Sequence, residues 1–332
     1  MCLTQDLVRE MRSELIQRAD LMKLASIEGL LDRRKLPILR IKTEILKTMT
    51  NRLLERGFYW ILPIMLAKAT DPLWPDPGAS IEKRVEIEVY GVRVKATQSM
   101  IFQKRVLVSL GPEKFFIFSP NIRIERRDRA FTGRHLYEFT QLEVEIAYAK
   151  MDDVFKVYED LIIESIKAVK EKCGEELKIL GRGELRIPKT PFKVFKRREL
   201  EEEYGEDWEL KLSRDLNDPA WVIDIPREFY DYEDEETGMW RNFDLILPEG
   251  YGEVISGGER EYEYEKMLRK IERDGLRREN YESILNLAKR GLLKPSAGAG
   301  LGVERFVGYV CGVRHVAEVQ PFPRIPGIVS EL

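Results

Sequence analysis

The segments KFFIFSPNIRIE (residues 114–125) and YEFTQLEVEIAY (residues 137–148) decide the fold of this chain. Both segments run apolar or alternate apolar with polar residues, which is typical of β-strands. The stretch between them, residues 126–134, is highly charged and is predicted to be a loop. Two strands joined in this way are expected to be neighbours in an antiparallel sheet.

The sequence on either side of these strands predicts helices around a few further strands. A hairpin is expected to turn near Gly91, and apolar runs predict strands at residues 221–225 and 243–247. Helical spacing of apolar residues is found at residues 4–34, 39–56, 152–172 and 259–290. Because the strands are concentrated centrally, the sequence predicts an α+β fold with a mainly antiparallel sheet flanked by helices.

The chain is expected to form one large domain behind a short extension. Residues 1–38 predict an N-terminal helical extension, which Pro37 separates from a main domain at residues 39–332. Within that domain, residues 175–220 are polar, charged and irregular in pattern, which predicts an insertion. Residues 298–312 predict a glycine-rich turn that runs into a helix.

Composition excludes several classes of protein. The 332 residues carry 55 basic and 58 acidic side chains, so the net charge of −3 gives no reason to expect general affinity for nucleic acid. Three cysteines form no C-x-x-C pair, and no apolar run is long enough to span a membrane. Two histidines make a multi-histidine metal site improbable within one chain. We therefore expect a cytoplasmic protein without a membrane partner.

Two arginine-bearing segments are the strongest candidates for a functional site, because the chain has no G-x-x-x-x-G-K-[ST], H-E-x-x-H or G-x-S-x-G motif. One is Gly298-Ala-Gly300-Leu-Gly302-Val-Glu304-Arg305. By itself it fits a plain structural turn as well as a nucleotide site. The other runs from Phe118 to Thr140 and includes Arg123-Ile-Glu125 and Arg134-His135-Leu-Tyr-Glu138-Phe139. A lone arginine on a strand is usually solvated or held in an ion pair. The hypothesis of a functional site therefore depends on both segments occurring together.

Together these segments resemble motifs 2 and 3 of class II aminoacyl-tRNA synthetases, and most closely those of the aspartyl/asparaginyl branch. That branch has F-R-x-E, a loop, R-H-x-x-E-F, and later G-x-G-x-E-R. Three further segments match in order, namely Gln98-Ser99 with Lys104, residues 252–260, and Phe322-Pro323-Arg324. The resemblance covers roughly residues 40–332. Because only some 38 residues precede this portion, too few for a five-stranded anticodon-binding barrel, the chain resembles the archaeal asparagine synthetases of this branch.

The resemblance implies an ATP site with Mg²⁺. Arg123 would contact the α-phosphate and act catalytically, and His135 would lie near the γ-phosphate. Phe139 and Arg305 would sandwich the adenine. The remaining implied contacts are Glu125, Gly302 and Glu253 for ATP, and Glu253 and Ser256 for Mg²⁺.

The resemblance also implies an amino-acid site. Lys104 and Arg260 would bind a substrate carboxylate and act catalytically, and a second cation at Lys104 indicates aspartate rather than asparagine. Asp71 lies where the family has the glutamate that binds the α-ammonium. The other implied contacts are Gln98, Ser99 and Glu143. The sequence departs from the family pattern at Asp71, which is shorter than glutamate, and at Met100-Ile101, which replaces Pro-Gln.

These assignments lead to the expectation of asparagine synthesis. Aspartate, bound end-for-end, would be activated by ATP at its β-carboxylate, and ammonia would displace AMP from the β-aspartyl adenylate. Glu143 or Asp244 could deprotonate the ammonium. The alternative is a truncated synthetase that transfers an amino acid to a tRNA or protein, and a non-catalytic paralogue is a third possibility. We expect a homodimer, because the helix at residues 39–56 resembles the dimer element of the family, and we expect no tRNA partner.

Overall fold

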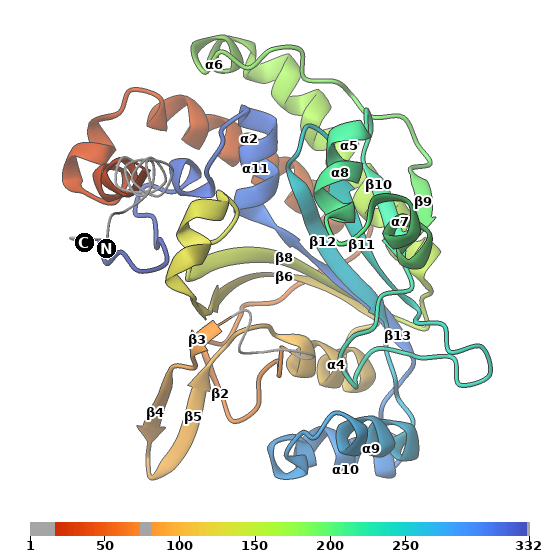
Figure 1. Cartoon of the computed structure of the whole chain (residues 1–332). Coiled ribbons are helices and arrows are strands. Elements are labelled where there is room, and N and C mark those ends of the chain that lie inside the picture. Colours follow the sequence, from red (N-terminus) through yellow and green to blue (C-terminus); the bar gives the residue numbers. More distant parts are fainter. Residues whose placement is uncertain (1–16, 74–80, 331–332) are drawn as a thin grey trace, which may run out of the picture.

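The computed structural model describes residues 17–73 and 81–330, and it is built around one eight-stranded sheet (Figure 1). The strand order is β1-β6-β8-β13-β12-β11-β10-β9, and only the two outermost pairs are parallel. The strands are β1 (Tyr59–Trp60), β6 (Lys114–Ile122), β8 (Glu138–Ala147), β9 (Lys193–Lys196), β10 (Ala220–Ile223), β11 (Asn242–Leu247), β12 (Gly252–Glu259) and β13 (Ser296–Gly302). The predicted α+β fold with a mainly antiparallel sheet is confirmed.

The two segments that decide the fold are paired as the sequence predicts. Strands β6 and β8 are antiparallel over their whole length, with Phe116 opposite Val144. The connection from β6 to β8 contains the short strand β7 (Ile124–Glu125) and, within the charged stretch, the 3-10 helix η2 (Arg127–Thr132). The predicted hairpin is present as β4 (Glu86–Val89) and β5 (Val92–Ala96).

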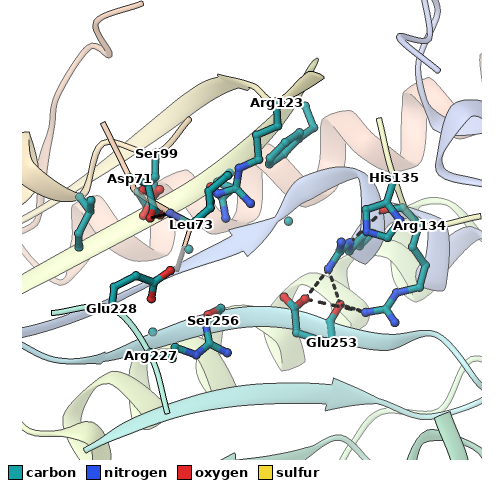
Figure 2. A pocket seen from close by; sticks show the side chains of 18 of the residues that line it. Asp71, Leu73, Ser99, Arg123, Arg134, His135, Arg227, Glu228, Glu253 and Ser256 are labelled. Atoms are coloured by element: carbon teal, nitrogen blue, oxygen red, sulfur yellow. Dashed lines mark hydrogen bonds and ion pairs between the residues drawn. The ribbon is translucent and has the colours of Figure 1, made fainter. Parts of the chain in front are cut away.

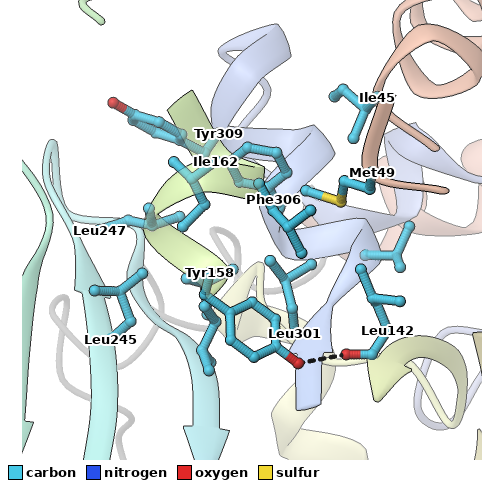
Figure 3. Packing of buried hydrophobic residues seen from close by; sticks show 14 of the residues in the cluster. Ile45, Met49, Leu142, Tyr158, Ile162, Leu245, Leu247, Leu301, Phe306 and Tyr309 are labelled. Atoms are coloured by element: carbon cyan, nitrogen blue, oxygen red, sulfur yellow. Dashed lines mark hydrogen bonds between the residues drawn. The ribbon is translucent and has the colours of Figure 1, made fainter. Parts of the chain in front are cut away.

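One face of the sheet packs against three helices, α2 (Lys35–Glu55), α5 (Met151–Lys172) and α11 (Val303–Cys311) (Figure 1). Figure 3 shows Tyr158 of α5 between the strands and the other helices, with Leu142 and Leu301 beside it. The Tyr158 hydroxyl lies 3.0 Å from the carbonyl oxygen of Leu142 and 2.8 Å from that of Ala299. This contact ties the helical layer to the two central strands, because a buried hydroxyl is costly to leave without a partner.

The opposite face of the sheet carries the polar positions of β8. Gln141, Glu143 and Glu145 alternate with Leu142 and Val144, so that the apolar residues lie in the helical core and the polar residues face away from it. Helix α4 (Ile101–Leu110) packs against β8, and a separate apolar cluster joins it to α9 (Tyr264–Arg273) and α10 (Glu282–Lys289). The space between these layers is where the site lies.

Helix α2 begins earlier than the sequence predicts. Pro37 lies inside the first turn of the helix instead of before it, because the amide that proline lacks has no intrahelical partner there. The domain boundary expected at residue 38 therefore falls within α2. Residues 17–24 are helical, and Leu21 packs against Val316 and Ile325 near the end of the chain.

The glycine-rich turn predicted at residues 298–312 is wrong in its first half. Residues 296–302 form β13, a central strand between β8 and β12. A Cβ on Gly298 would lie 2.2 Å from the Glu145 carboxylate and from the Val144 carbonyl oxygen. A Cβ on Gly257 of β12, which pairs with Ala299, would lie 2.4 Å from the Ala299 side chain. The glycines therefore serve close packing inside the sheet.

The segment at residues 175–220, which has no clear apolar period, contains three short helices and a strand. The helices are α6 (Gly174–Ile179), α7 (Arg197–Tyr204) and α8 (Trp208–Asp215). Strand β9 joins the main sheet by pairing in parallel with β10. Leu200 and Leu212 cover Val222 and Ile246 of the sheet, so the segment closes one end of the core.

Within the described residues, no helix combines the length and apolarity that a membrane crossing needs. Cys173 and Cys311 are free and buried. Cys2 lies outside the described residues, and so do residues 4–16 of the helical stretch predicted at residues 4–34.

Candidate active site

A cavity of about 310 Å³ lies on the polar face of the sheet (Figure 2). Its wall comes from β8, β12, β13, α4, α11 and the loops after β7 and β10. The residues that the sequence assigned to ATP, Mg²⁺ or substrate and that line this cavity are Asp71, Ser99, Lys104, Arg123, Glu125, His135, Phe139, Glu143, Glu253, Ser256, Arg260, Gly302 and Arg305. The structure thus brings together segments that are more than 200 residues apart in the chain.

Among the residues assigned to ATP, Mg²⁺ or substrate, Gln98 alone does not line the cavity. Its side-chain oxygen accepts a hydrogen bond from Nε of Arg84 at 3.2 Å, and its carbonyl oxygen accepts one from Nε of Arg123 at 3.0 Å. Gln98 therefore positions Arg123 through its backbone.

At one end of the cavity, Arg123 lies over the ring of Phe139, with its guanidinium carbon 5.3 Å from the ring centre. The expected sandwich had Arg305, not Arg123, opposite Phe139 across the adenine. Arg305 instead donates to the Glu253 carboxylate at 2.5 Å and to the carbonyl oxygen of Arg134 at 3.2 Å. In this structure both arginines are thus in contact with groups of the protein itself.

Glu253 is the anionic centre of this end of the cavity. Burial alone would raise the pKa of its carboxyl group, but Arg305, Arg134 and Arg227 lower that pKa to about 2. His135 stands nearby, with Nδ1 2.6 Å from the hydroxyl of Thr132. Burial, together with the charges of Arg305 and other arginines, lowers the pKa of His135 to about 3. At neutral pH the cavity therefore holds an ionised Glu253 and an uncharged imidazole.

A β-bulge aligns the two residues that were expected to bind Mg²⁺. Glu253 and Ser256 are three positions apart, which would place them on opposite faces of a regular strand. The pairing of β12 with β11 shifts register, however, so that Glu253 faces Ile246, Ile255 faces Leu245, and Val254 has no partner. The extra residue turns both Glu253 and Ser256 toward the cavity.

Glu253 and Ser256 alone provide too few oxygen ligands for Mg²⁺, so a bound ligand would have to supply the others. Among residues 17–73 and 81–330, no three His, Cys, Asp or Glu side chains form a metal site. One carboxylate and one hydroxyl suit Mg²⁺ when phosphates and water supply its other ligands. The Ser256 hydroxyl is now bound by Arg227, which also grips Asp244 at 2.6 and 2.7 Å.

At the other end of the cavity, the expected cations are already paired. Lys104 is 2% exposed; its ammonium is hydrogen-bonded to Glu143 and lies 3.6 Å from Glu145. Arg260 donates to Glu145 at 3.2 Å and to Asp231 at 2.7 Å. Burial opposes ionisation of Glu145, but Arg260 and Lys104 outweigh it and lower the pKa of its carboxyl. Both cations therefore have carboxylate partners in this structure, as buried charges require.

The two groups considered for deprotonating ammonium are also engaged. Glu143 is bound to Lys104, and Asp244 lies under Arg227. Burial raises the pKa of Asp244 to about 7 despite the charge of Arg227. Asp244 does not line the cavity, whereas Glu143 does.

Several residues of the cavity wall were not found from the sequence. Arg227, Glu228, Tyr230 and Asp231 come from the connection between β10 and β11, a polar stretch with no periodic pattern. Arg134 is the first residue of the matched R-H-x-x-E-F motif, but no role was assigned to it, so a signal was available. For the other four, only the tertiary fold carries the signal.

The fold and the cavity together are those of a class II synthetase-like enzyme, and comparisons agree. A model of the family "tRNA synthetases class II (D, K and N)" matches residues 29–326. This chain belongs to that family. Asparagine–tRNA ligase of Thermococcus kodakarensis is 30% identical over 94% of this chain and 77% of its own length. That of Thermus thermophilus is 32% identical over 88% and 70%.

The solved structures show the same relationship. Asparaginyl-tRNA synthetase from Pyrococcus horikoshii, complexed with asparaginyl-adenylate, has a TM-score of 0.79 and 27% identity, and the match covers 89% of this chain and 70% of that one. Aspartyl-tRNA synthetase from Entamoeba histolytica, at 20% identity and a TM-score of 0.74, supports the fold alone.

These names correct one expectation from the sequence. We expected aspartate and ammonia as partners and no tRNA. The relatives at 30–32% identity are named for joining asparagine to tRNA, so the expected absence of tRNA is contradicted. The inference rested on the few residues that precede the synthetase-like portion, and these do not bear on whether that portion itself binds tRNA.

Proposed function

We propose that this protein activates asparagine or aspartate with ATP, forms the aminoacyl adenylate, and transfers the aminoacyl group to tRNA. The single observation that carries the proposal is the cavity in which Arg123, His135, Phe139, Glu253 and Arg305 meet on one face of the sheet. The names of the relatives support the choice of amino acid and acceptor.

The chemistry needs charge neutralisation more than a nucleophile from the protein. A carboxylate oxygen attacks the α-phosphorus of ATP, a P–O bond forms, and pyrophosphate leaves. Arg123 suits the α-phosphate because its fork can hold two oxygens at once. Its contact with the Gln98 carbonyl oxygen aims the guanidinium before ATP arrives, which lowers the cost of reorganisation.

Glu253 would hold Mg²⁺ together with Ser256, and the ion would neutralise charge on the phosphates. The low pKa of Glu253 keeps it ionised throughout the physiological range, as a cation ligand must be. Binding would require Glu253 to exchange its contact with Arg305, which would then be free to contact the nucleotide.

A second candidate is asparagine synthesis, in which ammonia takes the place of tRNA as acceptor. Lys104 favours it, because an ammonium that lines the amino-acid end of the cavity suits the second carboxylate of aspartate. The nitrogen of ammonia would attack the acyl carbon of the β-aspartyl adenylate, with release of AMP and a proton. This reaction does not require that the protein lack a tRNA substrate.

One set of assays tests both candidates. ATP–pyrophosphate exchange is measured with aspartate, asparagine and lysine in turn, which covers the three amino acids of the family. AMP release is then followed after addition of either tRNA or ammonium chloride. Charging of tRNA supports the main proposal, and asparagine formed from aspartate and ammonium supports the second. Absence of exchange with all three amino acids would refute both.

A further inference from the structure

A second cavity, of about 350 Å³, lies next to the candidate active site and shares a wall with it. The side chains of Arg134 and Arg305 line both cavities. The rest of the second cavity comes from the end of the loop before β8, the loop after α6, the turn between β11 and β12, and the second half of α11 with the loop that follows it. The proposed function gives this second cavity no role.

Positive charge prevails in the second cavity. Its charged lining among the described residues consists of Arg134, Arg182, Arg305 and Arg314 with one acid, Glu249. Arg182 holds Glu249 through two contacts of 2.9 Å, and its own side chain is only 9% exposed. Arg314 is exposed and has no ion-pair partner within residues 17–73 and 81–330. An excess of guanidinium groups around a small space suits an anionic ligand with several oxygens.

Two of these arginines also have a buried donor that is not used. In the part of the chain that the structure describes, Nε of Arg134 and Nε of Arg182 have no hydrogen-bond partner. A buried donor without an acceptor is costly, and this cost indicates an acceptor that binds here.

Glycines with left-handed backbone conformations bring two of the arginines to the second cavity. Gly312 has a φ of +69° and Gly133 a φ of +73°, a region that favours glycine. A Cβ on Gly312 would lie 2.6 Å from Cδ of Arg182, and one on Gly133 would lie 2.6 Å from the carbonyl oxygen of Arg314. Glycine at these positions therefore allows Arg182 and the chain at Arg314 to lie as close as they do.

The wall between the two cavities is tied to Glu253 (Figure 2). Arg305 lies 2.5 Å from its carboxylate, and Nη2 of Arg134 lies 3.9 Å from it. If Glu253 turns to Mg²⁺, as the proposed function requires, both arginines lose this partner. Their charge is then available to phosphate groups on either side of the wall. Binding of Mg-ATP would thus make the second cavity more attractive to an anion at the stage at which pyrophosphate forms.

We propose that the second cavity binds pyrophosphate after it has left the α-phosphorus of ATP. The proposal rests on the proposed function, which supplies the pyrophosphate. Arg182 and Arg314 form the part of this site that is separate from the ATP cavity, because neither of them lines that cavity. Movement of the leaving group to these arginines takes it away from the adenylate and so disfavours the reverse reaction.

The lining favours a compact anion over a nucleotide base or an RNA strand. Bases are commonly held on a free aromatic face, but the cavity's Tyr251 is already engaged. Its hydroxyl donates to the carbonyl oxygen of Val313 at 3.1 Å, and its ring packs edge-on against Tyr309. An RNA backbone is usually followed by a groove of several free cations. Of the four arginines here, Arg314 alone is both exposed and without a described ion-pair partner.

The first test measures binding without any reaction. Sodium pyrophosphate is titrated into the protein at constant MgCl₂ concentration by isothermal titration calorimetry. We expect Kd to rise about fivefold in Arg314→Gln and more than about tenfold in Arg314→Glu, because a charge-assisted contact is lost and then reversed. The matched control is Arg290→Glu, which makes the same change of charge at an exposed position that lines neither cavity.

Three outcomes of this titration would overturn the proposal. One is that the wild type does not bind pyrophosphate. Another is that both Arg314 variants bind it within about twofold of the wild type, which would confine binding to the ATP cavity. The third is that Arg290→Glu weakens binding as much as Arg314→Glu, which would show a general effect of charge. Since Arg314 is exposed, its variants should fold normally, with melting temperatures within about 2 °C of the wild type.

The second test uses the kinetics of ATP–pyrophosphate exchange. In Arg314→Glu we expect KM for pyrophosphate to rise about tenfold, while KM for ATP stays within about twofold of the wild type. If KM for ATP rises by the same factor, Arg314 acts on the ATP cavity and the proposal fails. If KM for tRNA in the charging reaction rises instead, with KM for pyrophosphate unchanged, the cavity binds an RNA backbone and the proposal also fails.

The two tests keep this proposal apart from the proposed function. Pyrophosphate binding that depends on Arg314 supports the site even if no amino acid gives exchange. Normal exchange without such dependence refutes the site and leaves the proposed function intact.

Discussion

At the residue scale, most of the charged side chains of the cavity contact groups of the protein itself. Arg305 grips Glu253, Arg123 lies on Phe139, and Lys104 is bound to Glu143. Binding of ATP or an amino acid would therefore exchange partners. This arrangement keeps the buried charges satisfied before the ligand arrives.

Arg123→Lys tests whether the guanidinium fork is needed. Lysine keeps the charge but cannot hold two phosphate oxygens and the Gln98 carbonyl oxygen together. We expect kcat/KM in ATP–pyrophosphate exchange to fall about 100-fold, with melting temperature changed by less than about 2 °C. Arg126→Lys, at an exposed position of the following loop, is the matched control and should retain full exchange. Equal activity of both variants would remove Arg123 from the proposed role.

His135 gives a prediction about pH. Its pKa is about 3 in the folded protein, against 6.5 for an ordinary histidine. As pH falls through 6.5, His135 therefore becomes protonated in the unfolded chain but stays neutral in the folded protein. Its contribution to stability is full above pH 6.5 and is lost progressively as pH falls from 6.5 toward 3.

NMR titration of the ring protons measures this directly. The chain has two histidines, so the signal that disappears in His135→Gln identifies the residue. We expect that signal to show no titration between pH 8 and pH 5. A midpoint near 6.5 would contradict the buried, arginine-surrounded position of His135.

At the scale of elements, β13 shows how a strand can be built from glycine. Its glycines allow β8 and β12 to approach, while Ala299 and Leu301 fill the helical core. Sequence alone predicted a turn, because glycine is unfavourable in strands in general. The close contacts that reverse this preference exist only once three strands are aligned.

Gly298→Ala tests this explanation. The added Cβ would meet the Glu145 carboxylate and the Val144 carbonyl oxygen at 2.2 Å, so the central strands must separate. We expect a loss of at least about 3 kcal/mol in the free energy of unfolding, measured by urea denaturation. Gly174→Ala is the control, because nothing lies within 4 Å of its added Cβ. Similar midpoints for the two variants would show that β13 tolerates a side chain.

At the scale of the whole molecule, the site is a property of the assembled layers. Its two ends are formed by different elements, with Arg305 and Glu253 at one end and Lys104, Asp71 and Glu228 at the other. A ligand that spans both ends should bind with a more favourable free energy than the sum for its two halves. The reason is that one molecule loses translational and rotational freedom only once, whereas two separate molecules lose it twice.

A non-hydrolysable adenylate analogue tests this arrangement. We expect the asparaginyl or aspartyl analogue to raise the melting temperature by more than the sum of the rises caused by AMP and by the amino acid. A ligand at 100 times its Kd stabilises the folded state by about 2.7 kcal/mol, so the rise is measurable. The lysyl analogue is the control for selectivity. If the analogue raises the melting temperature only by the sum of the two separate rises, the nucleotide and the amino acid bind at independent sites.

The sequence by itself determined the α+β class, the pairing of the two decisive strands, and thirteen of the residues that line the cavity. It could do so because alternation along a strand and the order of short motifs are local properties. The tertiary structure decided the rest. The bulge at Val254, the glycine strand β13 and the second cavity depend on which segments lie side by side. Burial and charge pairing are set by distant neighbours, so no local pattern could have revealed them.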